Sequence, residues 1–230
     1  MNHAERQPRK LGWRFVLLAV LLVVVITAVI RSCWLDVYYI PSDSMDPLLK
    51  TGDRVLVSRT AYSSTPIRRG DVVVFDGRGS FAPLDSGRGP LGDAAHTVGE
   101  WLGIAGSDTV YVKRVLGVAG DHVHCCAADG RLQINGVPIK EGYLYPGDAP
   151  SETRFDVVVP PGKLWLMGDH RSVSADSRSL LGAPGGGLVS TGKVIGRPIQ
   201  TLWPLGSIRS LPRTTILPAS PSPATQKDAQ

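Results

Sequence analysis

Two serines in a short proline-bounded segment are the first residues whose types suit covalent chemistry. The segment 41–47 reads Pro-Ser-Asp-Ser-Met-Asp-Pro, so Ser42 and Ser44 lie two residues apart. A proline at each end restricts the backbone and suits a rigid turn. A serine hydroxyl held in such a turn is a candidate nucleophile if a base removes its proton. The same pattern also occurs in ordinary surface loops, so the segment needs a partner elsewhere in the chain.

Lys113 is the candidate base. It interrupts the apolar run 111–117, and the alternation of a β-strand would place Tyr111, Lys113 and Val115 on one face. A lysine on a half-buried face loses hydration, which lowers its pKa and favours the neutral amine. A neutral amine can take the proton of a serine hydroxyl. The alternative is a lysine at a strand edge whose amine extends into water.

A polar loop at 168–178 is the third segment that suits a functional site. It follows the apolar run 164–167, and most of its side chains can form hydrogen bonds. Such a loop after a buried strand can form a network that positions other groups, or a simple turn with an Asp–Arg pair. It contains His170, the one serious candidate base for a Ser–His–Asp triad, and sequence spacing leaves that alternative open.

The elements that must position these segments are short strands. Runs of Val, Ile, Leu and aromatic residues bounded by Gly, Pro, Asp or Asn predict strands at 53–58, 71–75, 109–118, 131–134, 155–159 and 163–167. Asn135-Gly136 predicts a type I′ hairpin turn. No amphipathic helix longer than about three turns follows residue 36. We therefore expect one mainly β domain over 36–211.

The chain begins with a candidate membrane anchor. Residues 15–30 carry no charge, and flanking apolar residues extend the predicted span to 15–33. Four basic residues against one acidic residue precede it, so the positive-inside rule places 1–14 in the cytoplasm and the rest outside. The alternative is a cleaved signal peptide, but no Ala-x-Ala site follows the run.

Composition limits the other classes of protein. The net charge of +5 is modest and dispersed, which argues against nucleic acid as a partner. Three cysteines do not make a disulfide framework.

Residues 77–108 are rich in Gly, Pro, Ser and Asp and are expected to form an inserted loop. Residues 212–230 are expected to be a disordered tail.

Taken together, the three polar segments resemble the type I signal peptidases, the membrane-tethered Ser–Lys proteases of peptidase family S26. The resemblance covers the chain from the anchor to about residue 211. The motifs that carry it, in order, are Ser44-Met45-x-Pro47, Gly52-Asp53-x-Val55, Tyr111-Val112-Lys113-Arg114 with Gly117 and Gly120-Asp121, and Gly168-Asp169-His170-Arg171 with Ser174-Ala175-Asp176-Ser177-Arg178. The family implies an antiparallel, barrel-like β-sheet domain behind one N-terminal transmembrane helix.

The resemblance also implies roles for individual residues. Ser44 matches the nucleophile and Lys113 the general base. Ser42 matches a hydroxyl that helps to form the oxyanion hole, Ser174 one that orients the lysine amine, and Tyr111 an aromatic residue packed beside it.

Two ion pairs, Asp169 with Arg114 and Asp176 with Arg178, match a structural network, and His170 becomes a scaffold residue. The chain departs from the usual family residues at Asp43, Leu48, Ala119, Ser172 and Val173. None of these changes removes a group that does chemistry.

The activity implied by the resemblance is removal of signal peptides from exported preproteins after small residues, at sites of the Ala-X-Ala type. The implied partners are preprotein signal peptides, the lipid bilayer and a nearby secretion translocon. No cofactor and no metal are implied. The implied location is the cell membrane, with a single span, a cytoplasmic N-terminus and an extracytoplasmic catalytic domain.

The segment 122–126 reads His-Val-His-Cys-Cys and brings together four possible metal ligands. A metal site is not expected there, because no second ligand cluster completes it. Cys125 and Cys126 could form a disulfide or remain thiols. A bond between neighbours is awkward, since their Cα atoms are about 3.8 Å apart across a trans peptide.

Two other functions compete with this interpretation. A self-cleaving Ser–Lys protease of the LexA type would share the dyad, but it would carry a DNA-binding domain where this chain has the apolar span. An anchored β-domain that only binds peptides or cell-wall material would use none of these groups chemically.

Overall fold

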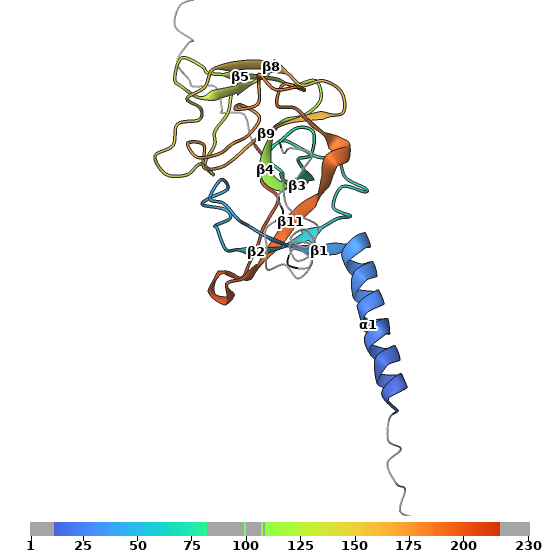
Figure 1. The fold of residues 1–230 in the computed structure, drawn as a ribbon. Coiled ribbons are helices and arrows are strands. Elements are labelled where there is room, and N and C mark those ends of the chain that lie inside the picture. Colours follow the sequence, from blue (N-terminus) through green and yellow to red (C-terminus); the bar gives the residue numbers. More distant parts are fainter. Residues whose placement is uncertain (1–11, 82–98, 100–106, 108, 217–230) are drawn as a thin grey trace, which may run out of the picture.

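The computed structural model describes residues 12–81, 99, 107 and 109–216. Its one α-helix precedes a series of short strands (Figure 1). The elements are α1 (Trp13–Cys33), β1 (Leu35–Tyr39), β2 (Arg54–Ser58), β3 (Val72–Asp76), β4 (Val110–Gly117), β5 (His122–Cys125), β6 (Leu132–Ile134), β7 (Val137–Pro138), β8 (Phe155–Val158), β9 (Lys163–Met167), β10 (Val189–Ser190), η1 (Thr191–Lys193), β11 (Val194–Trp203), η2 (Leu205–Ser207) and β12 (Arg209–Ser210).

The larger sheet is antiparallel and has the strand order β1-β2-β11-β3-β4-β9-β10, with β12 paired to β11. The long strand β11 joins its two halves, because it pairs with β2 from Arg197 onward and with β3 through Val194 and Gly196. Figure 1 shows β11 crossing the domain from its upper part down to the hairpin with β12. The predicted mainly β domain is confirmed, and all six predicted runs contain strands.

Strand β4 is only partly covered by its neighbours. It pairs with β3 from Val110 to Arg114, but its pairing with β9 begins at Arg114. Among the described residues, no strand pairs with the second edge of β4 over 110–113. A half-free strand edge offers backbone groups to an extended peptide.

The smaller sheet has the order β7-β6-β5-β8 and lies at the end of the domain away from α1 (Figure 1). The hairpin between β6 and β7 has positive φ at both turn residues, 54° at Asn135 and 76° at Gly136, as a type I′ turn requires. Trp165 of β9 is fully buried and packs on Phe155 of β8, with ring centroids 5.2 Å apart. This contact joins the two sheets in one core.

Two predicted regions differ from the structure or lie outside it. Of the predicted insertion 77–108, only residues 77–81, 99 and 107 are described. Residues 212–216, expected to begin the tail, pack on the domain instead. Arg213 forms an ion pair with Asp71, and Ile216 is only 7% exposed. The proline-rich composition around Arg213 and Ile216 is typical of a disordered tail, so composition alone does not predict these two contacts.

Candidate active site

Ser44 lies in a turn that the core holds in place. The turn follows β1, and Ile40 is fixed by two backbone hydrogen bonds, from its N–H to Asp53 O and from Gly52 N–H to its carbonyl, both 2.9 Å. Met45 and Leu49, which continue the turn, are buried. These contacts hold the turn in place, and Ser44 itself is only 9% exposed.

Lys113 reaches Ser44 from strand β4. Its Nζ lies 2.6 Å from Ser44 Oγ, within hydrogen-bond distance, and the residue is only 3% exposed. No carboxylate of a described residue lies within ion-pair distance of Nζ. Burial lowers the Lys113 pKa to about 8, although Asp176 and Asp169 at longer range oppose the shift. Near neutral pH a useful fraction of the amine is therefore uncharged and able to accept a proton.

The turn at Gly168 holds Ser44 from the other side. The His170 N–H donates to the Ser44 carbonyl at 3.2 Å. Gly168 approaches that carbonyl so closely that a Cβ added to it would lie 2.4 Å from the oxygen. Its own N–H donates to Asp176 Oδ2 at 3.0 Å, and its carbonyl accepts from Arg171 Nε at 2.8 Å. A side chain at this position would thus displace Ser44.

Both ion pairs expected from the family pattern form in the buried part of the site. Arg114 Nε and Nη2 donate to Asp169 at 2.6 and 2.5 Å, and the guanidinium carbon lies 4.0 Å from the centroid of the Tyr143 ring. Arg178 donates twice to Asp176, both at 2.8 Å. The network also contains a pair that sequence reasoning missed, Arg171 with Glu141.

Ser42 and Ser174 are placed differently from one another. Ser42 Oγ lies 3.3 Å from Ser44 Oγ, beside the candidate nucleophile, and its contribution to an oxyanion hole stays a prediction. Ser174 Oγ is buried and has no hydrogen-bond partner among the described residues, so the expected bond to Lys113 is not formed in this structure.

Residues around Ser174 line two different cavities. Val173 and Ala175 line the cleft beside Ser44, whereas Ser172 and Ser174 line a second cavity of about 170 Å³. The Ser174 hydroxyl itself lies beside Gly168, where a Cβ added to the glycine would be 2.3 Å from Oγ.

Tyr111 and His170 both border the site. The Tyr111 ring stacks on Phe75 at a centroid distance of 5.9 Å. The His170 ring stacks on Tyr145 at 3.8 Å, and its buried Nδ1 has no hydrogen-bond partner in the described part of the chain. A triad needs a carboxylate at that nitrogen, and Ser44 Oγ bonds Lys113 instead. In this structure Ser44 is therefore paired with the lysine and not with the histidine.

A cleft of about 700 Å³ opens over Ser44 and Lys113. The end of β1 and the half-free part of β4 line it together with the Ser44 turn. Its lining residues are Tyr38, Tyr39, Ile40, Pro41, Ser42, Asp43, Ser44, Met45, Thr51, Ser107, Val110, Tyr111, Val112, Lys113, His170, Val173 and Ala175. Most of them are apolar or uncharged, which suits an extended peptide with small apolar side chains.

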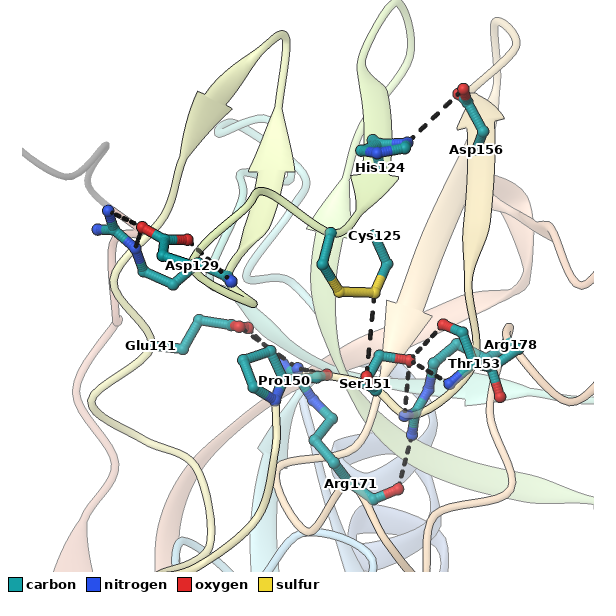
Figure 2. The surroundings of a disulfide bond; sticks show 12 residues. His124, Cys125, Asp129, Glu141, Pro150, Ser151, Thr153, Asp156, Arg171 and Arg178 are labelled. Atoms are coloured by element: carbon teal, nitrogen blue, oxygen red, sulfur yellow. Dashed lines mark hydrogen bonds and ion pairs between the residues drawn. A yellow bond between two sulfur atoms is a disulfide. The ribbon is translucent and has the colours of Figure 1, made fainter.

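The described residues contain no group of three or more His, Cys, Asp or Glu side chains arranged to hold a metal ion. His122 and His124 both contact Asp156 on the surface of the small sheet. Cys125 and Cys126 form a disulfide, the possibility that sequence reasoning left open (Figure 2).

The sequence matches a known protein family over most of its length. The sequence model of the family described as signal peptidase, peptidase S26, matches residues 13–203. A probable signal peptidase I of Mycobacterium leprae is 33% identical, over 90% of this chain and 83% of that protein. Signal peptidase I of Mycobacterium tuberculosis is 34% identical, over 85% of this chain and 74% of that protein. One from Bacillus licheniformis is 30% identical, over 83% and 89%.

A crystal structure of a signal peptidase I from Enterococcus faecalis aligns with 58% of this chain and 97% of that one, at 21% identity and a TM-score of 0.37. The assignment rests on the sequence matches, which extend through the apolar helix, the serine turn, the lysine strand and the Gly168 loop. The chain belongs to the signal peptidases of family S26, a family of serine endopeptidases.

Proposed function

We propose that the chain removes signal peptides from exported preproteins, with Ser44 as nucleophile and Lys113 as general base. The 2.6 Å contact between Lys113 Nζ and Ser44 Oγ carries this proposal. The amine is desolvated and unpaired with any described carboxylate, which is the state that a lysine base requires.

Each proton transfer in the proposed reaction uses the same amine. Neutral Lys113 takes the Ser44 proton while Oγ attacks the scissile carbonyl carbon. The C–N bond then breaks, and Lys113 gives the proton to the leaving amine. In the second half, Lys113 takes a proton from water, the hydroxide attacks the ester, and Ser44 Oγ regains a proton. The Ser44 N–H and Ser42 Oγ would stabilise the oxyanion.

The substrate peptide would bind extended along the free edge of β4 over 110–112. The apolar lining that includes Met45 and Val112 suits small apolar side chains at the −1 and −3 positions, as in Ala-X-Ala sites. The open edge supplies main-chain hydrogen bonds, so affinity would come from the backbone and selectivity from the lining.

Helix α1 would anchor the enzyme in the cell membrane. It is long and apolar enough to span a bilayer, and its side chains are exposed along its length. Figure 1 shows it extending away from the strands of the β domain, which it meets at its C-terminal end. The basic residues before it favour a cytoplasmic N-terminus and an extracytoplasmic domain, beside the bilayer and a secretion translocon.

The direct test compares Ser44→Ala and Lys113→Ala with Ser63→Ala and Lys140→Ala, matched changes at exposed positions. In a preprotein-processing assay the first two should lose at least about 10³-fold in kcat/KM, and the controls should retain wild-type activity. Substantial activity in Lys113→Ala would exclude the dyad and return His170 to consideration. If the wild type processes no preprotein with an Ala-X-Ala site, the peptide-binding alternative is favoured.

The pH dependence provides a second test of the base. Since protonated Lys113 is inactive, kcat/KM should fall about tenfold per pH unit below about pH 8 and reach a plateau above it. A profile that remains flat from pH 6 to 9 would contradict the assignment.

A further inference from the structure

The Cys125–Cys126 disulfide lies against a loop that contacts the active-site network. Cys125 Sγ is 4.0 Å from the carbonyl oxygen of Ser151, in the loop that leads into β8. Figure 2 shows the two sulfur atoms directly facing this part of the loop, with Arg171 and Arg178 reaching it from the opposite side. Pro150 and Ser151 are thus enclosed between the disulfide and two arginines.

Both arginines lead from this loop to Gly168. Arg171 donates through Nη1 to Pro150 O and through Nε to Gly168 O. Arg178 donates through Nη1 to Ser151 Oγ at 3.4 Å and is paired with Asp176, whose Oδ2 accepts the Gly168 N–H. The two backbone polar groups of Gly168 are therefore held by Asp176 and Arg171, in a network whose arginines also contact Pro150 and Ser151.

On its side facing the Gly168 turn the loop is held by polar contacts, which include two hydrogen bonds from Ser172 to the Asp148 carboxylate. The second cavity, of about 170 Å³, separates Ala149, Glu152 and Thr153 from the turn's serines. Where packing is absent, a few polar contacts decide the position of a segment. The contact of the disulfide on the outer side of Ser151 then limits how far the loop can move away from the arginines.

We propose that the Cys125–Cys126 disulfide is a positioning element of the active site, which holds Gly168 against Ser44 by bracing Pro150–Ser151 against Arg171 and Arg178. This inference rests on the proposed function of Ser44 and Lys113. It makes the peptidase sensitive to dithiols, because opening the disulfide removes the brace without removing any catalytic residue.

One molecule of a dithiol is sufficient to reduce the disulfide. Cys126 is half-buried and Cys125 is 3% exposed, so a thiolate attacks Cys126 Sγ. The S–S bond breaks, Cys125 leaves as a thiolate and takes a proton. The second thiol of the reagent displaces Cys126 as a thiol and closes the reagent's own disulfide. Two electrons and two protons pass to the protein.

The test measures the full chain in detergent micelles before and after dithiothreitol, with the opened bond verified by thiol labelling and mass spectrometry. Reduced enzyme should show kcat lowered about tenfold with KM nearly unchanged, since the Ser44–Lys113 geometry is disturbed while the peptide edge of β4 is not. Reoxidation should restore kcat. Cys33→Ser should respond like the wild type, which excludes the third cysteine as the cause.

A second readout requires no substrate. The Lys113 pKa, followed by NMR with ¹³Cε-labelled lysine, should rise on reduction, because a displaced turn admits water to the amine. This readout distinguishes the failure of the proposed function from the failure of the inference about the disulfide. If no preprotein is cleaved, the proposed function fails, but the Lys113 pKa still shows whether the disulfide positions the active site. Ser151→Ala should reproduce part of both changes, and Ser63→Ala should reproduce neither.

Two results would overturn the inference. One is a fully reduced enzyme with unchanged kcat and unchanged Lys113 pKa. The other is a loss of kcat that equals the unfolded fraction seen by circular dichroism, which would make the disulfide only a source of stability. Wild-type behaviour of Ser151→Ala would likewise exclude the route through Ser151 and Arg178.

Discussion

Asp176–Arg178, beside the Ser44 turn, and Asp76–Arg78, at the end of β3, are built from the same Asp-x-Arg sequence and form the same local ion pair. Asp129–Arg131 is a third copy. The three differ in burial. The Asp176 side chain is fully buried, whereas Arg78 is 56% exposed and Asp129 is 48% exposed.

Burial changes what the pair can do. In water, an Asp–Arg pair competes with hydration and is screened by salt. In the interior, the carboxylate must satisfy all its acceptor sites with protein donors, so Asp176 also binds the Gly168 N–H. Burial raises the pKa of Asp176, but the hydrogen bonds from Arg178 outweigh this effect and leave its pKa below the usual value. The buried pair therefore helps to position Gly168, whereas the exposed pairs lie in turns at the surface.

Breaking the buried pair should have the largest effect. Asp176→Asn leaves the Arg178 guanidinium buried without a counter-charge, so the free energy of unfolding should fall by about 3–5 kcal/mol. Urea denaturation of the full chain in micelles measures it, and Asp129→Asn is the matched control. A loss below about 1 kcal/mol would show that the buried pair is no more important than an exposed one.

Lys113 extends the comparison, because it is a buried amine that pairs with no carboxylate in the described part of the chain. Its folded pKa of about 8 lies below the ordinary value, so the unfolded chain binds more protons between pH 8 and 10.5, and stability rises with pH there. Lys113→Met removes this cost and should stabilise the inactive protein by on the order of 2 kcal/mol at pH 7. The gain should shrink above pH 9; a destabilised Lys113→Met would contradict the assigned burial cost.

The partly exposed copy should have a small, pH-dependent effect. Hydrogen bonds from Arg78 lower the Asp76 pKa to about 2, so this pair stabilises the fold above about pH 4 and the benefit is lost as the pH falls towards 2. Asp76→Asn should lower Tm by only about 2 °C at pH 7, because Arg78 is solvated, and by less at pH 3. A larger loss at pH 3 than at pH 7 would reverse the assigned sign.

The most exposed copy should have the smallest effect. Asp129→Asn should leave Tm and kcat at wild-type values within error, in calorimetry and in the processing assay. A clear loss of activity would mean that the turn between β5 and β6 contributes to the site in a way that its exposure does not suggest.

The sequence predicted the local part of this architecture well. The strand containing Lys113, the Asn135-Gly136 turn and the family motifs that bring Ser44 to Lys113 are encoded in short patterns. The strands and turns depend mainly on neighbours in the chain, so periodicity and turn chemistry suffice for them.

The remainder depends on contacts between distant segments. Arg171 pairs with Glu141, thirty residues away, and the fit of Gly168 against Ser44 depends on a missing side chain. The burial of the Ser174 hydroxyl beside Gly168 likewise depends on how the two segments pack. No local pattern contains this information, because it arises only when the sheets pack together.

The junction between α1 and β1 leaves only Trp34 between helix and strand. Arg31 Nε and Nη2 donate to Asp36 Oδ1 at 2.8 and 2.5 Å, and the Arg59 N–H binds the Trp34 carbonyl. Ser44 follows the end of α1 by eleven residues, so it can lie no farther than about 40 Å from it. In the proposed membrane-anchored peptidase, this braced junction would fix the height above the lipid at which a peptide bond is cut. Position relative to the membrane would then become part of substrate selection.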